Sequence, residues 1–258
     1  MTRPVLSSSN LRRPWRRFRR WCRVIQGRDL WCRRELTLAT ERHGTDYGGW
    51  TLWPAPLSAE SVVYSFGVGQ DVSFDLSLIR RFGCRVHAFD PTPRSVTWVH
   101  RQEFPPEFCF HDYGLGHVDG LVAMSPPVDP AHVSYSTVGP GAAADRLESF
   151  PVKRLRTIAA ELGHERVDLL KMDIEGAEYE ALADWAATGL PVGQILVEFH
   201  HRRGRDELAR TRQALAQLRA RDYLLFDVSP TGEEYAFVHQ AELPRAGRRS
   251  NEYCPNVQ

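Results

Sequence analysis

Short apolar runs alternate with longer amphipathic segments from residue 61 onward. Five of the apolar runs are bounded by turn-forming residues and predict strands: 61–67, 84–90, 107–114, 167–173 and 193–200. The segments between them carry apolar residues at helical spacing and predict helices over 70–83, 91–102, 152–163, 176–189 and 205–222. Two final runs predict a pair of strands, 223–229 and 234–239, joined by a turn that contains Pro-Thr-Gly.

This alternation predicts an α/β domain with a doubly wound parallel sheet, covered by helices on both faces. The closing strand pair is expected to add an antiparallel strand at one edge. Residues 120–125 predict a short extra strand, and 125–149, rich in glycine, proline, serine and alanine, predict a loop over the sheet. Sheets of this kind bind ligands at the carboxyl ends of their strands, so we expect the binding and catalytic residues there.

Composition changes this picture little for the body of the chain. The 258 residues are 42% hydrophobic and 25% charged, which suits one globular domain with an appendage. The sequence has no apolar run of about 18 residues and no secretory h-region, so we expect a cytoplasmic protein without a membrane-spanning helix. Five scattered cysteines without CxxC spacing predict reduced thiols rather than a zinc site.

Charge divides the chain into two unlike parts. Residues 1–34 hold 11 arginines and one acid, a net charge of +10, whereas residues 35–258 hold 22 basic and 31 acidic residues, a net charge of −9. We therefore divide the chain into a basic, Arg- and Trp-rich leader over 1–44, helical or partly ordered, and a domain over 45–258.

A helix beginning near Pro14 would align four residues of the leader on one face: Trp15, Phe18, Cys22 and Ile25. A basic amphipathic helix can lie on an anionic membrane surface or on nucleic acid, and an Arg-rich, acid-poor segment is also typical of a targeting peptide. A helix that packs on the body of the protein is the plainer alternative. We expect no specific nucleic-acid partner, and a location peripheral to a membrane stays open.

The first predicted strand ends in "YSFGVGQD", which predicts a ligand-binding turn. Gly67 and Gly69 would let the backbone approach a ligand closely in front of a helix N-terminus. The next strand ends in Asp90, about twenty residues on, where a carboxylate can accept hydrogen bonds from ribose hydroxyls. Together these residues indicate an adenosine-containing ligand, either a dinucleotide or S-adenosylmethionine.

A second motif, "KMDIEGAEYEAL", directly follows the apolar run "VDLL". Its carboxylates at Asp173 and Glu175 stand at the end of a buried strand, which is costly unless they bind something. The longer segment "DLLKMDIEGAEYEAL" resembles the signature of the FkbM-type methyltransferases, which use S-adenosylmethionine. The motifs "YSFGVGQDVSFD", "VHAFDPTP", "DYGLGHVDG" and "VKRLRTIAAEL" agree in order and spacing. "YGGW", near "VVYSFGVGQDVSF", further resembles the branch called methyltransferase-like protein 24.

The resemblance covers roughly residues 45–240 and leaves the leader outside. It implies a class I methyltransferase (Rossmann-like) fold, a doubly wound seven-stranded sheet whose last strand is antiparallel. It also implies that Gly67 and Gly69 flank the methionine part of the cofactor and that Asp90 takes the ribose. Asp112, at the end of the third strand, is our candidate for the adenine side.

The sequence departs from the family pattern at two positions of the cofactor turn. The family usually has an acid where Ser65 stands and a glycine where Asp71 stands. Both positions are candidates for cofactor binding. Asp71 would either meet the ammonium group of the cofactor or cap the following helix at its N-terminus.

The catalytic candidates are Asp173, His200 and Glu175. A hydroxyl is a weak nucleophile at neutral pH, so methyl transfer to it benefits from a base. Asp173 would be that base or would orient the substrate, and His200 is a second candidate base. Glu175 would face the same cleft or cap the next helix, and His200 would otherwise make a loop hydrogen bond. A divalent metal held by Asp173, Glu198 and His200 is an alternative that we do not favour.

The leading function is methylation of an oxygen on a small molecule, such as a sugar or a natural product. Transfer to nitrogen of a peptide or protein is the variant of this hypothesis, and a non-catalytic cofactor-binding module is another alternative. An NAD-dependent oxidoreductase fits less well, because Val72 replaces the third glycine of its turn and the two lysines exclude a Tyr-x-x-x-Lys pair. The oligomeric state is not predicted.

Overall fold

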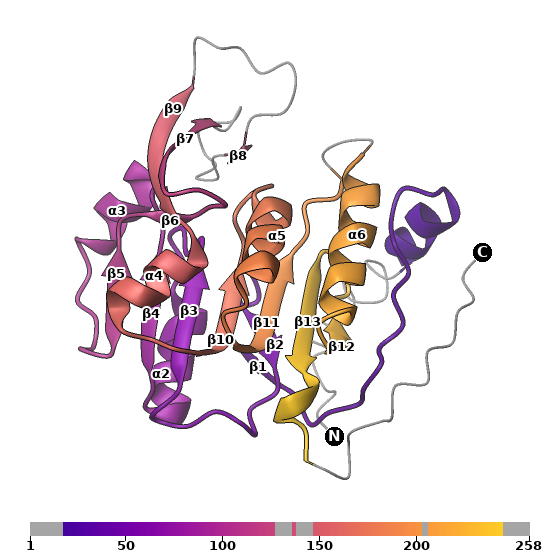
Figure 1. Cartoon of the computed structure of the whole chain (residues 1–258), viewed down its shortest axis with the longest axis horizontal. Coiled ribbons are helices and arrows are strands. Elements are labelled where there is room, and N and C mark those ends of the chain that lie inside the picture. Colours follow the sequence, from indigo (N-terminus) through magenta and orange to yellow (C-terminus); the bar gives the residue numbers. More distant parts are fainter. Residues whose placement is uncertain (1–17, 127–135, 138–146, 203–205, 245–258) are drawn as a thin grey trace, which may run out of the picture.

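The computed structural model describes residues 18–126, 136–137, 147–202 and 206–244. Its centre is a seven-stranded sheet with the strand order β12-β13-β11-β10-β3-β4-β5 (Figure 1). The strands are β3 Val62–Phe66, β4 Arg85–Phe89, β5 Phe108–His111, β10 Val167–Met172, β11 Val192–Glu198, β12 Tyr223–Val228 and β13 Glu234–His239. The predicted α/β class with a seven-stranded mixed sheet is therefore confirmed.

Strand direction changes at one end of this sheet. β5, β4, β3, β10 and β11 pair in parallel, whereas β13 is antiparallel to both β11 and β12. The expectation that the antiparallel strand lies at the edge was wrong. The hairpin joins the sheet through its second strand, so β13 is inserted beside β11 and β12 forms the edge.

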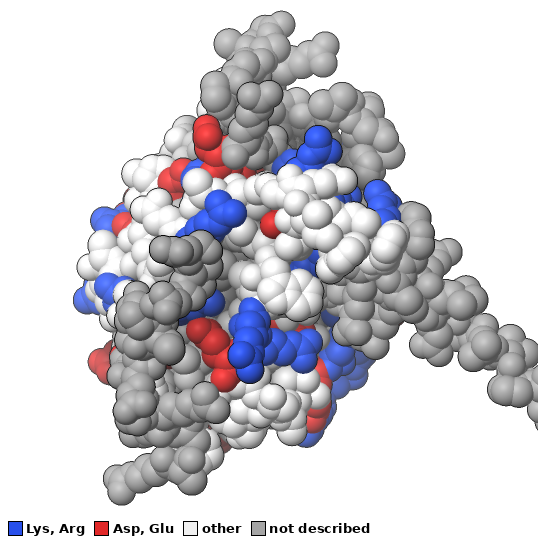
Figure 2. Space-filling view, turned by 90° about the vertical axis from the view of Figure 1, so that its right-hand side faces the viewer, with Lys and Arg blue, Asp and Glu red and all other residues white. Residues whose placement is uncertain are grey.

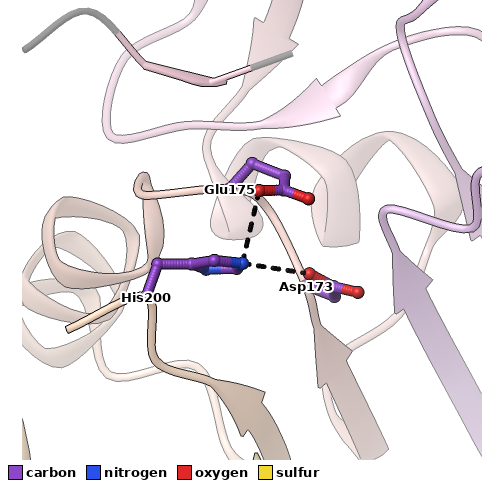
Figure 3. A group of neighbouring side chains, drawn as sticks. All are labelled: Asp173, Glu175 and His200. Carbon is purple, nitrogen blue, oxygen red and sulfur yellow. Dashed lines mark ion pairs between the residues drawn. The ribbon is translucent and has the colours of Figure 1, made fainter. Parts of the chain in front are cut away.

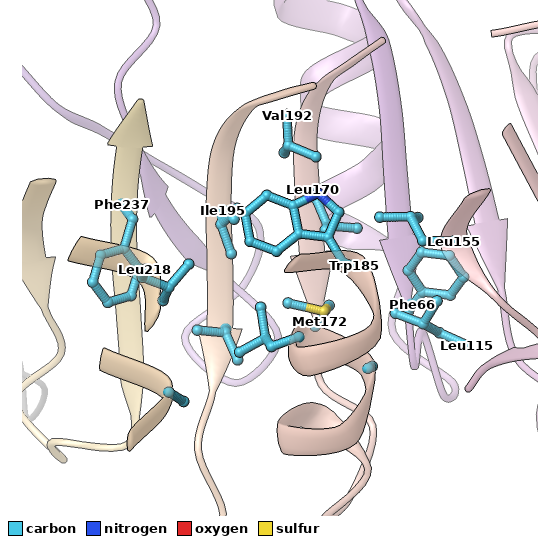
Figure 4. Packing of buried hydrophobic residues seen from close by; sticks show 14 of the residues in the cluster. Phe66, Leu115, Leu155, Leu170, Met172, Trp185, Val192, Ile195, Leu218 and Phe237 are labelled. Carbon is cyan, nitrogen blue, oxygen red and sulfur yellow. The ribbon is translucent and has the colours of Figure 1, made fainter. Parts of the chain in front are cut away.

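Helices cover both faces of the sheet. They are α2 Ser73–Phe82, α3 Pro93–Val99, α4 Leu155–Leu162, α5 Glu178–Thr188 and α6 Glu207–Arg219, and a short 3₁₀ helix, η2, spans Gln240–Glu242. Figure 1 shows α4, α5 and α6 together in front of the sheet. On that face Trp185 and Leu218 pack over strand residues such as Met172 and Ile195 (Figure 4).

The other face of the sheet is covered by α2, with Phe74 and Leu78 among strand residues such as Val63 and Leu169. Because both faces are buried, the central strands read as nearly continuous apolar runs rather than as alternating ones. This explains why the sequence pattern located them well.

A second, four-stranded sheet follows β5, with the order β6-β9-β7-β8. Its strands are β6 Gly114–Leu115, β7 Gly120–Ser125, β8 Ser136–Thr137 and β9 Glu148–Lys153. Only β7 was predicted. The helix expected over 152–163 begins later, at Leu155, because Val152 and Lys153 belong to β9. Most of the loop expected over 125–149 lies outside the described residues.

The described part of the leader lies against the domain. Strand β1 Glu41–His43 pairs antiparallel with β2 Trp50–Leu52, so the proposed boundary after residue 44 falls in the turn between paired strands. Leu30 is buried in the main core, and the Glu35 backbone N–H donates to the Leu225 carbonyl on β12, 2.7 Å away. The division into leader and domain stays a prediction.

Residues 18–25 form a helix, in line with the helix predicted for the leader, whereas its expected start at Pro14 lies outside the described residues. Within the described parts of the chain, the helices are too short or too polar to cross a membrane.

Candidate active site

The two central parallel strands bring the catalytic candidates together. Asp173 follows β10 directly, and His200 follows β11 by two residues. The register pairs Met172 with Val197, so both strands end at the same edge of the sheet. Asp173, Glu175 and His200 therefore meet, with the imidazole pointing between the two carboxylates (Figure 3). Each offers an oxygen or nitrogen atom within 4.8 Å of the others.

A third carboxylate, which the sequence did not predict, holds His200 from the other side. Oε1 of Glu178 lies 2.5 Å from Nδ1 of His200, and both oxygens of Glu178 accept from the backbone N–H of Gly176. The Glu178 side chain is fully buried at the start of α5. Acids are common in the first turn of a helix, where they interact favourably with the helix dipole. This ordinary explanation accounts for Glu178 in the sequence, which offered no reason to assign it to the site.

The other imidazole nitrogen faces the two predicted acids. Nε2 of His200 lies 3.3 Å from Oε2 of Glu175 and 3.7 Å from Oδ1 of Asp173. Burial alone would lower the His200 pKa, but the charge and hydrogen bond of Glu178, followed by the charges of Glu175 and Asp173, raise it to about 9. The imidazole is therefore protonated at neutral pH, and the expectation that His200 serves as a base does not fit this arrangement.

Asp173 is partly exposed, but one of its two carboxylate oxygens is buried. Its side chain is 29% exposed overall, yet Oδ1 is buried and has no hydrogen-bond partner among the described residues. Burial raises the Asp173 pKa. The positive charges of Lys171 and His200 lower it in part, and the negative charge of Glu175 raises it further. A carboxylate in this state is a stronger base than one in water. Because Oδ1 is buried on the side of His200, the exposed part of the side chain is not this oxygen.

Glu175 is held by an unusual backbone. Its φ of +57° lies in the left-handed region, which a residue with a side chain seldom adopts, and Gly176 follows with φ +108°. Such conformations persist where the surroundings fix them and are enriched at functional sites. The sharp turn from β10 into α5 aims Glu175 back toward His200.

The predicted cofactor turn lies directly against the Asp173 backbone. Gly67 has φ +73°, and a Cβ atom there would lie 1.7 Å from the carbonyl oxygen of Asp173. Glycine is therefore required by the approach of β3 to β10. The Lys171 ammonium, also missed in the sequence, donates to the Phe66 and Gly67 carbonyls and fixes this junction.

Asp90, which follows β4, is hydrogen-bonded to the predicted cofactor turn that follows β3. Its Oδ2 accepts from the Gly69 backbone N–H at 2.9 Å, and its Oδ1 accepts from the backbone N–H and the hydroxyl of Thr92. A carboxylate has about four acceptor positions, so these three bonds leave one on Oδ2 for a ligand. Asp90 is buried and is thereby held in one orientation.

The remaining cofactor candidates differ in position. Ser65 is fully buried under α2 beside Asp75, and no part of its side chain is accessible to a ligand. Asp71 accepts from the backbone N–H of Ser73, the first residue of α2, and from the Thr45 hydroxyl, whereas the N-cap position of this helix is Val72. Asp112 is exposed after β5.

Further acids lie near Asp173, and their proximity and burial raise their pKa values. Burial, followed by the charge of Asp173, raises the Glu198 pKa to about 8. Glu234 faces Glu198 across the β11–β13 pair, and its pKa is raised to about 7, mainly by burial. Tyr47 is mostly exposed here, and partial burial of its hydroxyl with the charges of Asp173 and Glu175 raises its pKa. At neutral pH Glu198 is therefore mainly protonated, and a positively charged ligand would lower the pKa values of these acids and favour their charged forms.

A divalent metal would find a different set of ligands from the one expected. Among the described residues, the atoms close enough to share an ion come from Asp173, Glu175 and His200, and Glu198 is not among them. The two carboxylates and the imidazole have the donor chemistry that such an ion takes. A metal would, however, have to displace the proton of His200.

Comparison with known proteins assigns the chain to a family. The model described as Methyltransferase FkbM domain matches residues 61–225, well over half of the chain, and the chain belongs to this family. It is 28% identical over 141 residues to Probable methyltransferase-like protein 24 of Rattus norvegicus and 27% identical over 141 residues to that of Homo sapiens. Each alignment covers 54% of this chain and 32% of the relative, so the chain spans about a third of their length.

A solved structure is also similar to this chain. The crystal structure of methyltransferase FkbM from Methylobacillus flagellatus KT aligns with a TM-score of 0.46 and 18% identity, covering 71% of this chain and 44% of that one. Family membership confirms the resemblance seen in the sequence and supports methyltransferase activity.

Proposed function

We propose that this protein is an S-adenosylmethionine-dependent methyltransferase of class I architecture that methylates an oxygen of a small molecule. The observation that carries the proposal is the contact between Gly67 and the Asp173 carbonyl, because it joins the cofactor turn to the acidic signature. The strand order, with β13 antiparallel between β11 and β12, supports the class I assignment.

The residues present fit the proposed cofactor. Asp90 has one acceptor position left, which would receive a ribose hydroxyl. Gly67 and Gly69 keep the turn free of side chains, and the acids around Asp173 suit a sulfonium and an ammonium group. Ser65 is inaccessible, and both oxygens of Asp71 already accept hydrogen bonds from Ser73 and Thr45, so we leave both residues out of the cofactor contacts. Asp112 stays a candidate for the adenine side.

The proposed mechanism assigns separate roles to Asp173, His200 and Glu175. When bound, S-adenosylmethionine supplies an electrophilic methyl group. The Asp173 carboxylate, whose pKa is raised by burial, receives the proton of the acceptor hydroxyl as that oxygen becomes the nucleophile. His200, protonated and fixed by Glu178, holds Asp173 and Glu175 in place. Glu175 is placed to receive a second hydroxyl of the acceptor, which would align the reacting oxygen.

The group of acids near Asp173 supports a second candidate function. Glu198, Glu234 and Glu175 would also attract the ammonium group of a peptide or protein, so nitrogen methylation is the alternative. A methyl-transfer screen with labelled cofactor tests both. It should give a labelled product among polyhydroxylated small molecules, together with S-adenosylhomocysteine. Label confined to peptides would favour the alternative, and the absence of turnover with every acceptor class would favour a non-catalytic binding module.

A further inference from the structure

The helix of the leader exposes its apolar side chains. Phe18, Trp21 and Ile25 are 61%, 53% and 64% exposed, and Trp31, shortly after the helix, is 71% exposed. Their spacing of three and four residues places the first three on one side of the helix. The Phe18 and Trp21 rings stack with their centroids 6.3 Å apart, so they form one continuous apolar surface.

The polar residues of the same segment attach it to the body. Arg20 is buried and donates to the Leu30 and Ser229 carbonyls. It also lies so close to Gly232 that a Cβ atom there would be 2.2 Å from the Arg20 Nε. An amphipathic helix that served only to pack on the domain would bury its apolar side, and here the orientation is reversed.

A buried acid fixes the segment after the helix. Asp29 accepts from Arg202 and lies 3.2 Å from Nε2 of His201, directly after the strand end that carries His200. The leader is therefore attached to the domain at residues that directly follow His200 of the candidate active site. This attachment makes the outward orientation of the aromatic side chains a defined feature of the fold.

Positive charge surrounds the apolar surface. Arg19, Arg28 and Arg33 are exposed on the same segment, and residues 1–34 carry a net charge of +10. Figure 2 shows basic side chains, with acidic ones beside several of them, next to uncharged surface on the side of the molecule where the leader helix lies. We propose that the surface formed by Phe18, Trp21, Ile25 and Trp31 inserts into the interface of an anionic phospholipid membrane.

Chemistry favours a membrane over other occupants. Trp and Phe are well suited to the lipid interface, and nearby arginines are attracted to anionic head groups. An exposed aliphatic side chain such as Ile25 gains from lipid but offers nothing for base stacking or phosphate binding, so nucleic acid explains the surface less completely. A second copy of this chain would present the same positive charge and would be repelled.

The test is binding of the full chain to phosphatidylcholine vesicles with and without phosphatidylglycerol. We expect binding to the anionic vesicles, weakened by salt, and little binding to the neutral ones. The triple variant Phe18→Ser, Trp21→Ser, Ile25→Ser should lose about tenfold or more of the affinity, because apolar insertion is removed. The variant Arg28→Gln should lose about fivefold of the affinity for anionic vesicles, which is the contribution of one basic residue near the membrane surface.

A matched control is available on the second sheet. Leu121 is 71% exposed on β7, so Leu121→Ser removes an equally exposed apolar side chain elsewhere and should leave vesicle binding unchanged. Equal binding by the triple variant and the wild type would overturn the proposal. So would preferential binding of RNA, or a dimer in solution that the triple variant abolishes. Because all substituted residues are exposed, thermal unfolding should show that every variant folds.

Discussion

The imidazole Nδ1 of His200 lies 2.5 Å from Oε1 of Glu178, a carboxylate with no exposed surface. This pair sets the charge of the whole site. It keeps a positive charge on His200 within reach of Asp173 and Glu175. In the mechanism that we propose, proton transfer is therefore assigned to the acids. The contact links the segment after β11 to the first turn of α5.

The first prediction concerns stability and pH. The folded-state pKa of His200 is raised to about 9 from an ordinary value of 6.5, so its stabilising contribution is complete below pH 6.5 and is lost as pH rises through 9. The part of the free energy of unfolding that is due to His200 should fall by roughly 2–3 kcal/mol over this range. Glu198 and Glu234, whose pKa values are raised to about 8 and about 7, add a fall in the same direction that does not depend on the His200–Glu178 pair. In Glu178→Gln the His200 pKa should drop, and much of the pH dependence due to His200 should disappear.

Titration of the imidazole by NMR, combined with denaturant unfolding at several pH values, checks this prediction. Glu180→Gln is the matched control, because Glu180 is on the same helix but is partly exposed and pairs with Arg210. A His200 pKa near 6.5 in the wild type, or the same change in both variants, would contradict the proposed pair.

The second prediction concerns the base. Asp173→Asn keeps the size of the side chain but cannot accept the proton of the acceptor hydroxyl. Methyl transfer should slow by about 10²–10⁴-fold, while the affinity for the cofactor stays close to that of the wild type. Single-turnover measurement of methyl transfer checks it. Near-normal turnover by the folded variant would remove Asp173 from catalysis, and loss of activity on chelation with recovery on added magnesium would instead assign it to a metal.

The third prediction concerns the contact that joins the two motifs. Gly67→Ala should lower the free energy of unfolding by about 2–5 kcal/mol, because the new methyl group meets the Asp173 carbonyl and φ is positive. Gly163→Ala is the matched control, with φ +74° and nothing within 4 Å of the added Cβ. Gly163→Ala should lower the free energy of unfolding by about 1–2 kcal/mol, because only the cost of a positive φ for alanine applies. Equal losses in the two variants would show that the close approach does not exist.

The fourth prediction concerns the leader. A protein that starts at residue 41 loses the burial of Leu30 and the contacts of Asp29 and Glu35, and should be less stable by about 2–4 kcal/mol. A protein that starts at residue 18 keeps these contacts and is the control. Both should bind the cofactor when folded, because the cofactor turn lies in the domain. Loss of cofactor binding by the folded shorter protein would make the leader part of the site.

The sequence predicted the positions of Asp173, Glu175 and His200 because parallel neighbours end at a common edge, and that relation needs only the order of elements. It did not predict Glu178 or Lys171, whose partners are set by tertiary packing. Strand β9 was missed because Pro151 interrupts its short alternating pattern, and proline usually argues against a strand. The β1–β2 hairpin was missed because its strands are short and its turn is held by Asp71, far along the chain.

Calorimetric titration of the full chain with S-adenosylmethionine tests the central claim most directly. We predict binding by the wild type, and a loss of roughly 1.5–3 kcal/mol in Asp90→Ala, since charge-assisted hydrogen bonds to the ribose are removed. Glu103→Ala, which changes an exposed acid between α3 and β5, should bind like the wild type. Unchanged affinity in a folded Asp90→Ala variant, or binding of NAD in place of S-adenosylmethionine, would contradict the account.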